Sequence, residues 1–306
     1  MKGVILAGGK GSRLYPLTYA TNKHLLPVYD QPMIYYPIQT LVNAGITEIL
    51  IVTGDIHAGH FINVIKNGHE LGLTHVEYAY QEGGSAGIAD ALKYAEDFAD
   101  GESIAVILGD NTTDANISKA VQGFQDGAMI FLKEVVDPER FGNPIFVKDN
   151  PKLIEKIIEK PKIAANKMAV TGLYFYDATV YDKIRALKPS DRGELEITDL
   201  NNAYIDENKM QWAPLEGFWS DAGTFHSLFR SNRYWAKKKL GNRYEDVVLE
   251  PVERLTIPIE YPKIDSCNHS RIYYVPLHLL AISVKPILWE QVPPSAALSR
   301  LAPFTQ

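Results

Sequence analysis

The sequence of 306 residues contains a single cysteine, Cys267. One thiol forms neither an intramolecular disulfide nor a cysteine-based zinc site, so domains that depend on either are excluded. Apolar runs are short as well: none approaches the roughly 18 residues that cross a bilayer, and the segment 275–284 is interrupted by His278. The opening run 1–7 is too short for the apolar region of a signal peptide. We therefore expect a cytoplasmic protein with no membrane partner.

Positive charge is also scarce. The chain has 31 Lys and Arg residues against 37 Asp and Glu residues, a formal net charge of -6. A dedicated nucleic-acid binder usually carries a basic face, so no nucleic-acid partner is expected. A hydrophobic fraction of 46% and a charged fraction of 22% exclude a disordered chain, which lacks the apolar residues to offset the entropy of ordering. The net charge does not exclude a local basic pocket that binds small phosphates.

Short apolar runs alternate with helix-like segments through the first half. Strands are expected at 2–7, 48–53, 75–80, 104–108 and 128–133. Helices are expected at 33–44, around 61–68 and at 88–98. Strands that alternate with helices of about ten residues indicate βαβ units. The pattern predicts an α/β, Rossmann-like fold, in which helices flank a mostly parallel sheet.

The middle of the chain changes character over about 140–176. Strand-like segments at 145–148, 153–158 and 169–176 are separated by turns. We interpret this region as a small β insertion that lies beside the sheet and roofs a pocket there. Helices are expected again at 181–187, 198–206 and 224–240, which completes a main domain over 1–240.

The tail, 241–306, has a different composition. It holds eight of the 18 prolines but one of the 22 glycines, and it has no repeat of fixed period. A β-helix of hexapeptide repeats would show such a period. We expect a non-repeat C-terminal extension of unknown role, made of extended segments and at most one short helix.

A glycine-rich turn, GGKGSRL at 8–14, directly follows the first strand. Ligands of parallel sheets bind beyond the carboxyl ends of the strands, and 109–114 lies at another such end, so the two loops can meet over one pocket. Glycines let backbone N–H groups surround a phosphate, while Lys10 and Arg13 add positive charge. No Gly-Lys-Ser/Thr closes the loop as in a Walker A motif. Leu14 replaces the third small residue of a dinucleotide fingerprint, which disfavours a nicotinamide dehydrogenase.

Further motifs follow in order along the chain. They are KHLLP at 23–27, LGDN at 108–111, DPERFG at 137–142, EKP at 159–161, AVTGLYFYD at 169–177, RGELEITD at 192–199 and WSDAGT at 219–224. Together with GGKGSRLYPLT at 8–18, these motifs resemble the signature of the nucleoside-diphosphate-sugar pyrophosphorylases, a family of sugar nucleotidyltransferases. The resemblance covers roughly 1–240 and is greatest for members that use dTTP and glucose 1-phosphate.

This resemblance implies an enzyme of the EC 2.7.7 class. The expected reaction is Mg²⁺-assisted in-line attack of glucose 1-phosphate on the α-phosphate of dTTP, which gives dTDP-glucose and pyrophosphate for dTDP-rhamnose and polysaccharide synthesis. Little acid–base work is needed, so catalysis is mostly positioning and charge neutralisation. Family members assemble as dimers or tetramers, so a homo-oligomer is expected.

The resemblance also implies a role for individual residues. Asp110 and Asp221, the latter expected in a turn, would hold Mg²⁺, although either could instead cap a following helix. The implied catalytic residues are Arg13, Lys23, Asp110 and Lys160. The implied nucleotide-binding residues are Leu6, Gly8, Gly9, Gly11, Ser12, Arg13, Gln81, Gly87 and Asp110. The implied sugar-phosphate-binding residues are Lys23, Leu108, Gly142, Glu159, Lys160 and Val170. Gln81 and the Gly87 backbone would read the pyrimidine edge, since an amide offers both a donor and an acceptor.

The sequence departs from the family pattern at several positions. They are Gly83 to Ala86, which lack a proline, and Thr112, Thr113, Asn143, Pro144, Ser220 and Ala222. None is a charged catalytic group, and we expect all of them to border the sugar or base pocket. Two alternatives therefore stay open. One is the same chemistry on UTP or another sugar phosphate, because a pocket rejects a one-methyl difference by only about 10–200-fold. The other is a non-catalytic sugar-nucleotide sensor, which need not keep both carboxylates.

Overall fold

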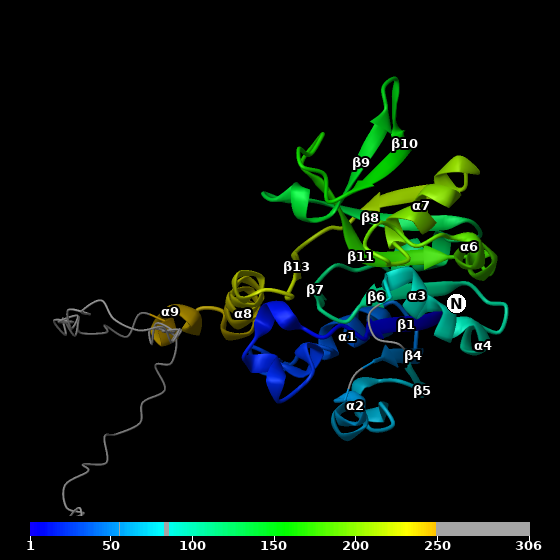
Figure 1. Ribbon diagram of the computed structural model, residues 1–306. Helices are drawn as coiled ribbons and strands as arrows, with labels where there is room; N and C mark the ends of the chain where they lie inside the picture. Colours follow the sequence, from blue (N-terminus) through cyan, green and yellow to red (C-terminus); the bar gives the residue numbers. More distant parts are fainter. Residues whose placement is uncertain (55, 83–85, 249–306) are drawn as a thin grey trace, which may run out of the picture. The chain divides into compact units, whose positions relative to one another are not determined.

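The computed structural model describes residues 1–54, 56–82 and 86–248 (Figure 1). The expectation for the tail from 249 onward lies outside these residues. The centre is a seven-stranded sheet in the order β12-β8-β11-β6-β1-β4-β5. Its strands are β1 (Lys2–Ala7), β4 (Glu48–Thr53), β5 (His75–Tyr80), β6 (Ile104–Leu108), β8 (Ala128–Glu134), β11 (Met168–Tyr176) and β12 (Met210–Pro214). All neighbouring pairs are parallel except the two made by β11, so the predicted mostly parallel sheet is confirmed.

Helices cover both faces of this sheet. On one face lie α3 (Ile88–Leu92), α4 (Glu96–Ala99), α6 (Val180–Ala186) and α7 (Ile197–Asp206), and on the other lie α1 (Tyr35–Asn43), α2 (Ala58–Ile65) and α5 (Ser118–Gly123). Two further helices, α8 (Phe225–Leu240) and α9 (Arg243–Val248), follow outside the sheet. Short 3-10 turns occupy Ser12–Leu14, Leu17–Tyr19, Lys23–Leu25, His69–Leu71, Lys93–Ala95 and Pro138–Arg140. The single helix expected at 88–98 is divided into α3 and α4 by one of these turns. No helix among the described residues is both long and apolar enough to span a bilayer.

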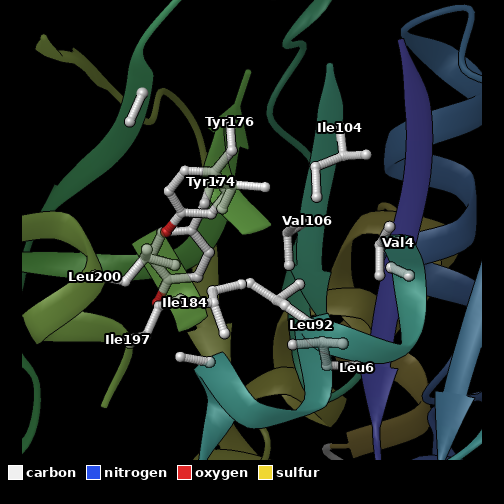
Figure 2. Packing of buried hydrophobic residues seen from close by; sticks show 14 of the residues in the cluster. Val4, Leu6, Leu92, Ile104, Val106, Tyr174, Tyr176, Ile184, Ile197 and Leu200 are labelled. Atoms are coloured by element: carbon white, nitrogen blue, oxygen red, sulfur yellow. The ribbon is translucent and has the colours of Figure 1, made fainter. Parts of the chain in front are cut away.

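The continuous apolar runs of β1, β4 and β6 are explained by burial on both faces. Successive side chains of a strand point to opposite sides, so Val4 and Leu6 pack with α3, α6 and α7, as Figure 2 shows. Ile5 and Ala7 pack on the other face, with α1 and α2. The first strand is therefore held from both sides, and the loop that follows it starts from a fixed point.

The β insertion is smaller than expected. Only β9 (Gly142–Val147) and β10 (Asn150–Glu159) form a separate antiparallel hairpin, which stands away from the central sheet in Figure 1. The third segment, β11, lies inside the sheet between β6 and β8. Eight of its nine residues are buried, so its apolar run is that of a central strand rather than of an exposed hairpin.

A second small ladder joins two distant motifs. Strand β7 (Asn111–Thr113) pairs antiparallel with β13 (Trp219–Asp221), and Asn111 lies opposite Asp221. Asp221 was expected in a turn but is the last residue of this strand. The chain then enters α8 through a capping box, in which the Thr224 side chain accepts from the Ser227 N–H. This pairing brings Asp221 to the end of β6, beside Asp110. The remaining two-stranded ladder joins β2 (Pro27–Val28) and β3 (Gln31–Pro32).

Candidate active site

A cavity of about 340 Å³ lies beyond the carboxyl ends of β1 and β6, the position expected for ligands of such sheets. Most of the site residues inferred from the sequence line it together. They are Leu6, Gly8, Gly9, Arg13, Lys23, Gln81, Gly87, Leu108, Asp110, Gly142, Glu159, Lys160, Val170 and Asp221. Gly11 and Ser12 are not among the lining residues. Gly11 has a φ of +64°, and a methyl group there would stand 2.9 Å from Lys23 Cβ, so this glycine permits the turn that packs against Lys23.

The two candidate metal-binding carboxylates meet at the backbone of Gly223. A methyl group on Gly223 would stand 3.2 Å from Asp110 Oδ2, 3.5 Å from Asp221 Oδ2 and 3.2 Å from Arg13 Nη2. Asp110 is 8% exposed, and 14% of the Asp221 side chain is exposed. Two acidic groups and one guanidinium therefore converge on the backbone of Gly223, where a methyl group would press on them.

Each carboxylate has a cation against it. Lys23 Nζ donates to Asp110 Oδ2 at 2.6 Å, and Arg140 Nη2 donates to Asp221 Oδ2 at 2.9 Å. Burial opposes ionisation of Asp110, but the Lys23 charge and its hydrogen bond outweigh burial and lower the pKa of Asp110. Burial and the nearby charge of Asp110 raise the pKa of Asp221, against the pull of Arg140. The pKa values of the two carboxyl groups are thus shifted in opposite directions, as happens when two carboxylates lie close together.

His24 adds no positive charge to this cluster. Burial, together with the Lys23 charge, lowers the pKa of His24 to about 3. Its Nδ1 lies 2.7 Å from Asn22 Oδ1. A neutral imidazole at physiological pH leaves Lys23, Arg13 and Arg140 as the cations beside the carboxylates.

The two carboxylates fit a divalent cation. Asp221 Oδ1 is buried, and no described residue gives it a hydrogen bond. Within the described residues, Asp110 Oδ1 accepts from Asn111 Nδ2, at 3.0 Å. No group of three or more His, Cys, Asp or Glu side chains suited to a metal occurs in the described part of the chain. Mg²⁺ is usually bound by one or two carboxylates, with phosphates and water completing its shell, so this donor set suits it.

The part of the cavity next to β5 carries Gln81 and Gly87. Gly87 has a φ of +109°, and a methyl group there would stand 2.3 Å from the carbonyl oxygen of Leu195. Leu195 is bonded on both sides, since its N–H donates to Ala86 and its carbonyl accepts from Ala89. Only glycine fits at position 87, and the backbone of this residue is exposed to the cavity.

The part of the cavity next to the β9–β10 hairpin carries Glu159 and Lys160. Glu159 Oε2 accepts from Thr198 Oγ1 at 2.6 Å, and Glu159 Oε1 pairs with Lys160 Nζ at 2.9 Å. Gly142 approaches Val170 closely, since a methyl group on Gly142 would stand 3.5 Å from Val170 Cβ. The hairpin therefore delivers its polar groups to one side of the cavity.

Several lining residues were missed from the sequence. Arg140 and Asn111 lie inside motifs that were recognised, DPERFG and LGDN, so the motifs themselves held the available signal. Asn111 Oδ1 accepts from the Gly172 N–H at 3.1 Å and from Trp219 Nε1 at 2.7 Å. The other missed lining residues are His24, Ile88, Ala91, Phe141, Gly172, Tyr174, Glu194, Ile197 and Trp219.

The expectation that the departures from the family pattern border the pocket is wrong for Thr112, Thr113, Asn143, Pro144, Ser220 and Ala222, none of which lines it. Thr112 Oγ1 donates to the Ser220 carbonyl, and Thr113 Oγ1 donates to the Phe218 carbonyl. Asn143 accepts from the Ala165 N–H and donates to the Met168 carbonyl. These side chains stabilise the cavity wall from outside the cavity. Neither periodicity nor motif spacing reveals their hydrogen bonds.

The buried pair of Lys23 and Asp110 predicts a pH-dependent stability. The pKa of Asp110 is lowered by folding, so the pair stabilises the fold above the unfolded pKa, and this contribution is lost as pH falls. Lys23→Met should lower the free energy of unfolding by about 3–5 kcal/mol at pH 7, because it leaves a buried unpaired charge. Urea unfolding should show this deficit shrinking below pH ~4.

Asp110→Asn in the Lys23→Met background is the matched control. It removes the uncompensated charge, so the double variant should be more stable at pH 7 than Lys23→Met alone. A double variant no more stable than the single one would contradict the pairing.

The sequence model of the nucleotidyl transferase family matches residues 2–238. The glucose-1-phosphate thymidylyltransferase of Xanthomonas campestris pv. campestris (strain B100) is 42% identical over 239 residues, which cover 76% of this chain and 80% of that protein. The enzyme of the same name from Mycobacterium tuberculosis (strain CDC 1551 / Oshkosh) is 40% identical over 233 residues, which cover 74% and 80% of the two chains.

Solved structures agree. A crystal structure from Bacillus anthracis, assigned as a glucose-1-phosphate thymidylyltransferase and holding sucrose, superposes with a TM-score of 0.72 at 46% identity, and covers 76% of this chain and 94% of that one. A UDP-glucose pyrophosphorylase complexed with UDP-glucose has a TM-score of 0.67 at 22% identity, which supports the fold alone. On the family match, the identities and the shared fold, this chain is an enzyme that belongs to the nucleotidyl transferase family.

Proposed function

We propose that this enzyme transfers the thymidylyl group of dTTP to glucose 1-phosphate, and releases dTDP-glucose and pyrophosphate. The observation that carries the proposal is that one amide suited to a base, four cations suited to phosphates and two adjacent carboxylates suited to a divalent cation are among the groups that line one cavity. They are Gln81; Arg13, Lys23, Arg140 and Lys160; and Asp110 and Asp221. The names of relatives at 40–46% identity support dTTP and glucose 1-phosphate as the pair.

The base would lie between Gln81 and the backbone of Gly87. Gly8 leaves room for it, because a methyl group at Gly8 would stand 2.8 Å from Gln81 Oε1. Leu6 and Gly9 line the same part of the cavity. An amide side chain and a backbone peptide suit the alternating donors and acceptors on the edge of a pyrimidine.

Three cations would neutralise the phosphates. Arg13 would grip the β- and γ-phosphates through its planar fork, which matches phosphate geometry better than a lysine ammonium. Lys23 and Lys160 would neutralise the α-phosphate and the sugar phosphate. In the protein alone, Lys23 and Lys160 pair with Asp110 and Glu159, which keeps these cations in place before the substrates arrive.

The residues placed to hold a divalent cation, Mg²⁺ by donor type, are Asp110 and Asp221. When bound, such an ion would neutralise charge on the phosphate oxygens. Arg140 pairs with Asp221 and opposes the rise in the pKa of this carboxyl that burial and Asp110 cause. The buried Oδ1 of Asp221 supports this role, because a polar atom without a partner is costly in a folded protein.

The chemical step needs no proton transfer. An oxygen of the sugar phosphate forms a bond to the α-phosphorus, while the bond from that phosphorus to the bridging oxygen breaks and its electrons leave with pyrophosphate. Charge on the leaving group would be met by Arg13. The neutral state of His24 is in keeping with a reaction that uses positioning and charge rather than a general acid or base.

The sugar would lie against the β9–β10 hairpin. Glu159 would accept hydrogen bonds from the sugar hydroxyls. Gly142, Val170 and Leu108 also line the cavity. Thr198 Oγ1 donates to Glu159 Oε2, so the orientation of the carboxylate is set before the sugar binds.

The substrate pair is tested by pyrophosphate release with Mg²⁺ and glucose 1-phosphate, with dTTP, UTP, ATP, CTP and GTP offered in turn. We expect release to be fastest with dTTP. Release with UTP alone would keep the chemistry and change the nucleotide. Binding of nucleotides without turnover across this panel and across other sugar phosphates would favour a sensor.

The proposed role of Asp110 in holding the metal predicts the effect of Asp110→Asn. Turnover should fall by at least about a hundredfold, while the far-ultraviolet circular dichroism stays that of the wild type. Asp126→Asn is the matched control, because Asp126 is exposed and lies outside the cavity. Near-normal turnover of Asp110→Asn would overturn the metal assignment.

We also propose that residues 1–240 form the catalytic domain, in keeping with the family match to residues 2–238 and with α8 ending at Leu240. Deletion of 241–306 should then leave turnover unchanged. A truncated protein with normal circular dichroism but no turnover would show that the extension contributes to the site. Homo-oligomerisation and a cytoplasmic location stay predictions.

A further inference from the structure

Gln81 is held by one hydrogen bond from its side-chain amide and by another from its backbone. It is 4% exposed, and its N–H donates to the Thr53 carbonyl at 2.7 Å. Its Nε2 donates to Asp90 Oδ2 at 2.9 Å. Its Oε1 lies on the opposite side, against the backbone of Gly8. The amide therefore has a defined order, with nitrogen toward Asp90 and oxygen toward the first glycine of the loop after β1.

Asp90 sets this order because it acts only as an acceptor. It lies in α3, and its second oxygen accepts from Lys93 Nζ at 2.8 Å. Burial opposes ionisation, but the hydrogen bonds from Lys93 and Gln81 outweigh it and lower the pKa of Asp90. An ionised carboxylate offers no hydrogen, so the Gln81 amide must turn its NH₂ group toward Asp90.

We propose that Asp90 is a positioning residue that fixes the orientation of the Gln81 amide and so selects bases with an imino N–H, thymine or uracil, against cytosine. The inference rests on the proposed function, in which Gln81 meets the base. Thymine and uracil carry an N–H beside a carbonyl on the edge that an amide reads. Cytosine carries a lone pair beside an amino group, the reverse order.

Reading cytosine would require the Gln81 amide to turn over. The turned amide would place Oε1 against the Asp90 carboxylate, and the hydrogen bond at 2.9 Å would become a contact between two acceptors. An unmade buried hydrogen bond is costly, and more so beside a charge. Asp90 thus supplies the repulsive element that specificity needs as well as an attractive one.

The test is Asp90→Asn, which keeps the size of the side chain but offers both a donor and an acceptor. The Gln81 amide can then adopt either order. We expect the ratio of kcat/KM for dTTP to that for dCTP, measured by pyrophosphate release with glucose 1-phosphate, to fall about tenfold, the equivalent of one hydrogen bond. A merely structural role for Asp90 would lower both values together and leave the ratio unchanged.

Lys93→Met is the matched control. It removes the ion pair on the outer oxygen of Asp90 but leaves the carboxylate facing Gln81, so the ratio should stay that of the wild type. Calorimetric binding of dTTP and dCTP to Asp90→Asn and to Asp90→Ala gives a second measurement that needs no turnover. In both variants the preference for dTTP over dCTP should weaken.

The outcomes distinguish a wrong role for Asp90 from a wrong role for Gln81. If the wild type prefers dTTP to dCTP and Asp90→Asn keeps that preference in turnover and in binding, Asp90 does not orient the amide, and the proposed function stands. If the wild type binds and turns over both nucleotides equally, Gln81 does not read the base, and the inference falls with that part of the proposed function.

Discussion

Two carboxylates buried around one glycine repel each other, and the site depends on how that repulsion is balanced. Asp110 is paired with Lys23 and Asp221 with Arg140, so neither negative charge is left unmatched in the interior, where an unpaired charge is costly. The same four groups are those that the proposed reaction, with two anionic substrates and a divalent cation, would use. The arrangement that balances these charges in the protein alone is therefore also the one that would receive the phosphates.

The backbone delivers these charges through short, shared elements. Asp110 follows β6, which lies in the centre of the sheet, and Asp221 reaches it only because β13 pairs with β7. Asn111 ties the two together, since its side chain contacts Asp110, the Gly172 backbone and the Trp219 indole. A single buried amide thus links the Asp110 carboxylate and the strand of Asp221 to β11, the strand that carries Val170 into the cavity wall.

The parts that the sequence predicted are those encoded locally. Strands β1, β4 and β6 were placed correctly because continuous apolar runs mark strands buried on both faces, and motifs led to most lining residues. Long-range pairing was not predictable: β11 looked like part of the insertion, and Asp221 looked like a turn residue, because their partners lie far away in the chain. Arg140 was passed over because its importance comes from the Asp221 carboxylate, 81 positions later. Thr112 was misplaced for the same reason, since its bonds run to β13 and α8.

The β9–β10 hairpin is a sheet of its own, joined to the rest through β11 and α7 and pairing with no strand of the central sheet. Its ladder hydrogen bonds join β9 only to β10, and its bonds to the rest of the fold come from side chains such as Asn202 and Trp212. Substitutions in its outer half therefore leave the seven-stranded ladder intact. On the proposed placement of the sugar, the acceptor side of the cavity can therefore be changed without rebuilding the nucleotide side. A library confined to the hairpin is the natural starting point for engineering enzymes that make new glycosyl donors.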